Sequence, residues 1–203
     1  MAQTSTPRHE LISGEEKDMG RSNLKVDFNK LQCPPGCEVI VEILRHHFFG
    51  QLLTTSCTVP EVYIIQFWKH FEPSKDRKTV QTRIDSRDIQ FTADDLRTAL
   101  GLPNEGSKEV KKFTPPPSQY EVLQFLRKLG YDESERVLAN ATSVNRKHIP
   151  QPWLTLYAIL TNCVTGKLTG HEHCSLEFLQ LIWGLVNDRT VDYAQFIWKD
   201  FLL

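Results

Sequence analysis

The sequence predicts an all-α, mainly helical fold of about six to eight helices, with room for one small β-hairpin near residues 79–91. Three observations carry this prediction. Apolar residues recur at helical spacing through most of the chain beyond residue 37, and several of these runs are framed by helix start and stop signals. Only residues 79–91 alternate polar and apolar letters as strands do. With 203 residues, 40% of them hydrophobic, the chain is long enough for one sizeable core or two small ones.

The predicted domain organisation is a flexible polar tail at 1–32 followed by a single helical domain at 33–203. The tail lacks the apolar run of a secretory signal, and no stretch of about 18 apolar residues occurs to span a membrane. The 5 cysteines are odd in number and irregularly spaced, which favours a reducing, intracellular compartment without separating cytoplasm from nucleus. Charges nearly balance, 24 basic against 25 acidic, so any nucleic-acid binding requires a local patch.

The first predicted helix runs from about residue 37 to residue 53 and is broken near Gly50. The second begins at Pro60 and ends at Pro73. Its apolar letters predict a very aromatic buried side, made of Val62, Tyr63, Ile65, Phe67, Trp68 and Phe71. A hairpin is predicted next, from Thr79-Val-Gln-Thr-Arg-Ile-Asp and Asp88-Ile-Gln-Phe91.

The best-specified element is the short helix after this hairpin. Thr92 is the predicted N-cap, and the acidic pair Asp94 and Asp95 suits the positive end of the helix dipole. Gly101 supplies a left-handed C-terminal position, and Pro103 prevents continuation. The residues expected to face the core are Leu96, Ala99 and Leu100.

Four further helices are marked in the second half, with a proline-rich loop at 106–117 before the first of them. The first opens with a capping box at Ser118 and Glu121 and ends at Gly130. Its predicted apolar face is Tyr120, Val122, Leu123, Phe125, Leu126 and Leu129. The polar segment 132–147 is ambiguous, with a short turn around Val137 and Leu138.

The remaining helices begin near Pro152, after Ser175 and after Asp192. The last one reaches Leu203 on an apolar run without a cap. This pattern predicts a truncated reading frame, in which the natural protein continues.

Two clusters of cysteine and histidine raise the question of a metal. Cys33 and Cys37 have zinc-like spacing, with His46 or His47 as a third ligand and Cys57 as a distant fourth. Those histidines lie about 14 Å along a helix from Cys37, so a proline turn beside a buried cysteine and two surface histidines is the preferred interpretation. His171, His173 and Cys174 form the second cluster, interpreted as an exposed polar loop before Ser175. No metal and no cofactor is predicted.

Enzyme motifs are absent from the sequence. There is no Gly-rich phosphate loop, no Gly-x-Ser-x-Gly elbow, no His-Glu-x-x-His helix and no dinucleotide fingerprint. Cys57 and Cys163 have no marked base, so each is interpreted as a small buried hydrophobe. We therefore predict no catalytic residues and no small-molecule substrate.

Two basic stretches, 69–83 and 108–112, are candidates for binding nucleic acid. If both lie on one face, they form a phosphate-binding patch; otherwise they are solvated loops. The candidate residues are Lys75, Arg77, Lys78, Arg83, Lys108, Lys111 and Lys112. The four tryptophans, by contrast, all fall in amphipathic helical patterns and are predicted to lie in the core: Trp68, Trp153, Trp183 and Trp198.

The order of several aromatic and Pro/Gly anchors resembles a helical domain of plant retrotransposon-related open reading frames, often labelled gag/pol-like or putative plant transposon proteins. These anchors are Val62-Tyr-Ile-Ile-Gln-Phe-Trp68, Leu100-Gly-Leu-Pro103, Pro116-Pro-Ser with Leu123 to Tyr131, His148-Ile-Pro-Gln-Pro-Trp153, Thr165-Gly-Lys167, Ile182-Trp-Gly184, Val191-Asp-Tyr193 and Ile197-Trp-Lys-Asp-Phe201.

This resemblance implies an origin in a transposable element rather than a reaction. The zinc knuckle, protease, polymerase and integrase signatures of retroelement polyproteins are all missing from the sequence. The leading hypothesis is a non-catalytic domain with a gag-like assembly or protein-interaction role, which includes self-association. The alternative is a nucleic-acid-binding module that uses the two basic loops. A metal-dependent enzyme built from His171, His173 and the cysteines is the third hypothesis.

Overall fold

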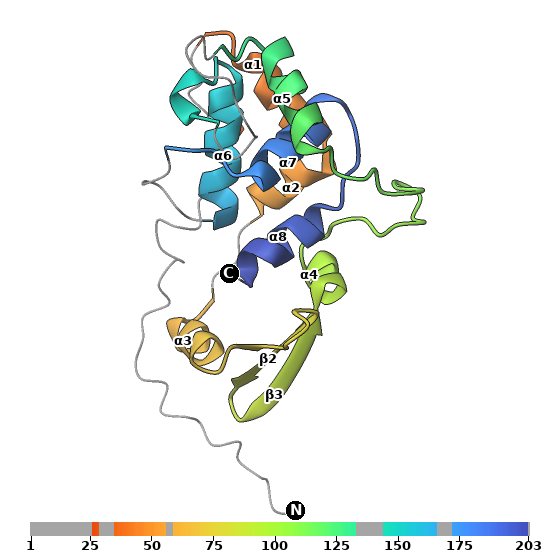
Figure 1. Cartoon of the computed structure of the whole chain (residues 1–203). Helices are drawn as coiled ribbons and strands as arrows, with labels where there is room; N and C mark the ends of the chain where they lie inside the picture. Colours follow the sequence, from red (N-terminus) through yellow and green to blue (C-terminus); the bar gives the residue numbers. More distant parts are fainter. Residues whose placement is uncertain (1–25, 29–34, 56–58, 133–143, 166–171, 203) are drawn as a thin grey trace, which may run out of the picture.

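The computed structural model of the chain describes residues 26–28, 35–55, 59–132, 144–165 and 172–202. Within these residues it contains eight α-helices and one three-stranded antiparallel sheet (Figure 1). The helices are α1 (Glu38–His46), α2 (Phe48–Thr54), α3 (Glu61–Lys69), α4 (Ala93–Ala99), α5 (Gln119–Lys128), α6 (Trp153–Thr165), α7 (Leu176–Val186) and α8 (Tyr193–Phe201). The strands are β1 (Glu72–Pro73), β2 (Thr79–Ile84) and β3 (Arg87–Thr92).

The fold is mainly helical, as predicted, but it is not all-α. The predicted hairpin is confirmed as β2 and β3, whose tight turn at Asp85 and Ser86 has positive φ angles of 47° and 63°. Strand β1 extends the hairpin to three strands in the order β1-β2-β3. Because β1 has only two residues, one of them a proline, its alternation is too short to be recognised in the sequence.

Two hydrophobic clusters lie on either side of α8. The larger cluster is built mainly by α1, α2, α5, α6 and α7, which pack together in the upper part of Figure 1. The smaller cluster lies between the sheet, α4 and the C-terminal half of α8. Its buried members are Val80, Ala93, Trp198 and Leu202. Helix α8 joins the two clusters because it contributes Tyr193 and Phe196 to the larger and Trp198 to the smaller.

The first helix breaks at His47 rather than at the predicted Gly50. His47 is extended (φ −94°, ψ 139°), and its Nδ1 accepts a hydrogen bond of 3.1 Å from the Phe49 N–H, which caps α2. Gly50 instead allows α2 to cross α1 closely, because a Cβ on Gly50 would lie 1.7 Å from the Leu44 carbonyl oxygen. Periodicity alone cannot distinguish a glycine that breaks a helix from one that permits close packing.

His47 is not the surface histidine that the sequence predicted. Its ring contacts Phe48 and Tyr193, and its Nε2 lies 3.3 Å from the Tyr193 hydroxyl. Because Nδ1 accepts from a backbone N–H, the proton of the neutral ring is on Nε2 and is donated to that hydroxyl. Burial lowers the pKa of His47 from 6.5 to about 4, against a small opposing effect of Asp188.

This lowered pKa predicts a loss of stability in mild acid. Between pH 6.5 and about pH 4 the unfolded chain binds the proton that folded His47 excludes, so stability falls as the pH falls. We expect the free energy of unfolding in urea to decrease by about 2 kcal/mol between pH 7.5 and pH 5. A His47→Asn variant keeps a capping acceptor and should lose most of this dependence. An unchanged pH profile in the variant would contradict the assignment.

The local capping predictions are confirmed. Capping boxes open α4 at Thr92 with Asp95 and α5 at Ser118 with Glu121. Gly101 and Gly130 follow these helices with positive φ angles of 64° and 93°. Ser175 and Asp192 cap α7 and α8.

Side-chain orientation on α4 and α5 was predicted less well. Ala99 is exposed, and Arg97 is buried on the inner face of α4 together with Ala93. On α5, Tyr120 is 70% exposed although it was placed on the apolar face. Ala99 and Tyr120 lie at the margin of the apolar faces of their helices, where helical spacing does not decide which side chains meet the core.

Part of the range predicted as a tail packs against the large cluster. Val26 is buried, and its backbone N–H donates a 2.8 Å hydrogen bond to the Leu53 carbonyl oxygen. Val137 and Leu138, which were predicted to form a short turn, lie outside the described residues.

Candidate interaction surface

Helix α3 is composed mostly of apolar letters, yet none of its residues is fully buried. It begins after Pro60, which is its N-cap, and carries Glu61 in its first turn and Lys69 in its last. Ile65 is 58% exposed and Trp68 is 54% exposed. The predicted buried side is therefore wrong for Ile65 and Trp68, including the core position of Trp68, whereas its other four predicted members are half-buried.

The inner side of α3 is attached to the sheet. The Thr82 hydroxyl donates a 2.8 Å hydrogen bond to the Phe67 carbonyl oxygen, and the Asp85 N–H donates one of 2.9 Å to the Gln66 side chain. The Phe67 ring lies 6.0 Å from that of Phe91 on β3. These contacts fix α3 along one face of the sheet (Figure 1), and within the described parts of the chain its Ile65 and Trp68 side chains stay more than half exposed.

Trp68 is half exposed but held in place by other rings. Its ring centroid lies 5.2 Å from that of Phe67, 5.1 Å from Phe71 and 5.6 Å from Phe201. Aromatic pairs at these separations stabilise each other beyond the area they bury. The indole is therefore a positioned apolar group at the surface, which costs little side-chain entropy to bind.

We define the α3 stripe as Glu61, Ile65, Trp68 and Lys69. These residues are spaced i, i+4, i+7 and i+8, so they lie on one side of the helix. The centre of the stripe is apolar, and its two ends carry opposite charges. Trp is among the residues most enriched at the energetic centres of protein interfaces.

The other tryptophans lie where the sequence placed them or close to it. Trp198 is 3% exposed, and its Nε1 donates a 3.0 Å hydrogen bond to the Arg77 carbonyl oxygen. Trp153 and Trp183 are partly buried against the large cluster.

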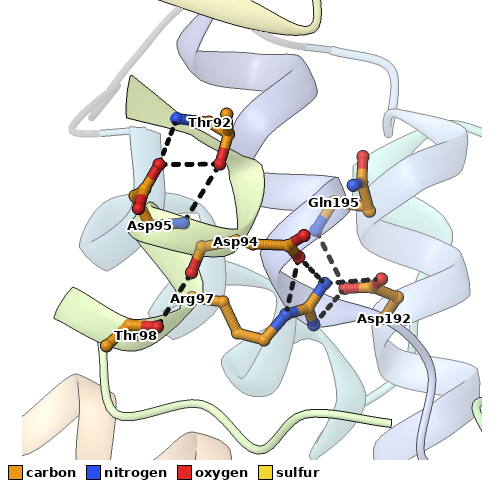
Figure 2. Close-up of polar contacts among 7 residues, drawn as sticks. All are labelled: Thr92, Asp94, Asp95, Arg97, Thr98, Asp192 and Gln195. Atoms are coloured by element: carbon orange, nitrogen blue, oxygen red, sulfur yellow. Dashed lines mark hydrogen bonds and ion pairs between the residues drawn. The ribbon is translucent and has the colours of Figure 1, made fainter. Parts of the chain in front are cut away.

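A buried ion pair that the sequence did not reveal holds α4 against α8 (Figure 2). The Arg97 guanidinium donates to both carboxylate oxygens of Asp192 at 2.8 and 3.0 Å and also pairs with Asp94 at 3.3 Å. Phe113 lies under the guanidinium at 5.0 Å. Hydrogen bonding to Asp192 raises the pKa of Arg97. Residues 97 and 192 are 95 positions apart, so no local pattern links them.

The seven predicted basic residues do not form one patch. Lys75, Arg77 and Lys78 lie in the exposed turn between β1 and β2, and Arg83 lies at the other end of β2, where it pairs with Asp88 at 2.6 Å.

The loop that carries the remaining three, Lys108, Lys111 and Lys112, is attached elsewhere. Its Thr114 N–H donates a 2.8 Å hydrogen bond to the Thr190 carbonyl oxygen just before α8. In Figure 1 this loop extends to the side, away from the hairpin.

Part of the basic stretch lines a groove of about 720 Å³ beside α8. Arg77, Lys78 and Lys199 all line this groove, although Lys199 lies on α8, far along the chain from the basic stretch. Asp94 and Glu177 line the same groove. The groove is thus of mixed charge rather than a phosphate channel.

The cysteines and histidines considered as metal ligands are not brought together either, where the structure describes them. Cys33, Cys57 and His171 lie outside the described residues. Cys37 is fully buried near Gln151 and Thr155, whereas His46 is exposed and pairs with Glu42. Among the residues that the structure describes, no three His, Cys, Asp or Glu side chains gather as a metal site would require.

Two of the described thiols, Cys163 and Cys174, are poorly suited to nucleophilic chemistry. Burial raises the pKa of Cys163 and of Cys174 to about 11. Both are therefore protonated thiols at neutral pH.

No family model matches the chain, and neither do any curated proteins or solved structures. Across the described parts of the chain, every helix is too short or too polar to cross a bilayer.

Proposed function

We propose that this chain is a non-catalytic protein-interaction module that associates with further copies of itself through the α3 stripe. The observation that carries this proposal is the exposure of Ile65 and Trp68 on a helix whose other side is fixed to the sheet. Large apolar side chains grouped at a surface are typical of protein interfaces. A gag-like assembly role in a retroelement-derived protein, as the sequence resemblance implies, is the biological form of this proposal.

The exposed apolar residues of the described chain favour α3 over other surfaces. They are Val39, Ile65, Trp68, Ile89 and Tyr120. Val39 and Tyr120 lie on α1 and α5, whereas Ile65 and Trp68 are one turn apart. Ile89 is opposite Thr82 in the sheet register, so it lies on the sheet face that α3 covers. Three of these five residues therefore lie on α3 or on the sheet face beneath it.

The test is the solution mass of the protein, measured by light scattering over a wide concentration range in reducing buffer with a chelator. We expect the mass to rise with concentration, and Ile65→Ser with Trp68→Ser to abolish the rise. The matched control is Val39→Ser with Tyr120→Ser, which also removes two exposed apolar groups and should leave the rise unchanged. A wild-type mass equal to one chain at every concentration would overturn the proposal.

Nucleic-acid binding is the second candidate function, and the groove beside α8 is the observation that favours it. Arg77, Lys78 and Lys199 place three cations around that groove. Because Asp94 and Glu177 lie among them, we expect only weak binding of single-stranded RNA at physiological salt. Fluorescence anisotropy over a salt series measures this. Tight binding that falls steeply with salt, and that Arg77→Glu abolishes, would favour nucleic-acid binding over self-association.

A further inference from the structure

We infer that the α3 stripe pairs with the α3 stripe of a second copy in an antiparallel, two-fold symmetric arrangement. This inference rests on the proposed function and specifies the geometry of the partner. Its basis is the symmetry of the stripe itself. Glu61 and Lys69 lie four residues before and after Ile65, at opposite ends of the nine-residue helix.

An antiparallel pair centred on Ile65 brings complementary groups together at every position of the stripe. The two Ile65 side chains meet at the axis, and the Trp68 indole of each copy covers the first turn of the other. Each Glu61 then faces Lys69 of the second copy, and the two helix dipoles run in opposite directions. Glu61 also takes part in an interaction within its own chain. The two copies are therefore complementary through the overall charge of their helix ends, not through a dedicated ion pair.

A parallel arrangement is disfavoured by the same residues. It would set Glu61 against Glu61 and Lys69 against Lys69, and it would align the helix dipoles. A two-fold axis also limits the assembly to two chains, because both copies bind through the same surface and neither α3 stripe then remains free. The expected product is therefore a dimer rather than an open chain.

The dimer should be weak in this chain. A nine-residue helix is about 13 Å long, which is shorter than the contact surface of most stable complexes. We therefore expect association that is visible only at high protein concentration and is sensitive to single substitutions.

Charge reversal tests the arrangement. We expect Glu61→Lys alone and Lys69→Glu alone each to weaken the dimer about tenfold, because each creates two like-charge contacts across the axis. An equimolar mixture of the two variants should recover the wild-type mass, since both contacts are then opposite in charge. The double reversal in one chain should also dimerise as the wild type does. Matched controls are Glu38→Lys at the start of α1 and Lys128→Glu at the end of α5, both without effect.

The outcomes distinguish this inference from the proposed function. If the wild type associates and Ile65→Ser with Trp68→Ser abolishes association, but neither charge reversal weakens it, the antiparallel pairing is wrong and the interaction surface stands. A mass that climbs past two chains overturns the closed pair. A monomer at every concentration overturns both proposals. Recovery of the dimer on mixing shows that neither variant is misfolded. The antiparallel pairing is tested by the weakening from each single reversal, because a parallel pair already has two like-charge contacts in the wild type.

Discussion

Replacing Trp198 with alanine should lower the free energy of unfolding by about 3–5 kcal/mol. Trp198 is 3% exposed and is the largest side chain of the small cluster. Its removal leaves a cavity between the sheet and α8, bordered by Phe91 and Phe201 at ring distances of 5.7 and 6.0 Å. The Arg77 carbonyl oxygen also loses its hydrogen bond from the indole.

Urea unfolding followed by circular dichroism measures this loss, and two variants separate its causes. Trp198→Phe keeps an aromatic ring and should cost about half as much as alanine. Trp68→Ala removes the same side chain where it is 54% exposed and should cost about 1–2 kcal/mol. If the alanine variants at 68 and 198 were equally stable, the small cluster would not hold α8 against the sheet.

The second large effect is expected at Arg97. We predict that Arg97→Met lowers the free energy of unfolding by about 2–4 kcal/mol, because it leaves the partly buried Asp192 carboxylate without its cation. Methionine retains much of the volume and apolar stem of arginine, so the loss reports chiefly on charge and hydrogen bonding. Arg127→Met, in the exposed last turn of α5, is the matched control and should change stability by less than about 0.5 kcal/mol.

A double-mutant cycle isolates the ion pair. Asp192→Asn removes the charge but keeps a side-chain oxygen that caps α8 at the Gln195 N–H. We expect Arg97→Met to cost at least about 1.5 kcal/mol less in the Asp192→Asn background than in the wild type. Additive effects of the two substitutions would show that Arg97 and Asp192 do not stabilise the contact between α4 and α8.

Elements specified by neighbouring residues could be predicted from the sequence. The capping boxes at Thr92 and Ser118, the left-handed glycines and the β2–β3 hairpin each lie within one short continuous stretch of the chain, so local patterns identify them. The break at His47 was misplaced because the ring that caps α2 is fixed by Tyr193, which lies far along the chain.

The candidate surface could not be predicted because it depends on tertiary packing. The letters of α3 indicate an apolar helix, but not which of its apolar side chains stay exposed in the fold. Arg97 was overlooked for a related reason, since an arginine in a short helix is normally exposed and its partner lies in another element. The sequence alone leaves open whether the two basic loops share one face, because that depends on the fold, which attaches them at different places.

Hydrogen exchange at low and at high protein concentration tests the central claim most directly. If the α3 stripe is the contact surface, peptides that cover residues 61–69 will exchange more slowly at high concentration. Peptides that cover 108–112 and 119–128 will exchange at the same rate in both samples. Unchanged exchange across 61–69, or new protection only at another surface, would contradict the account.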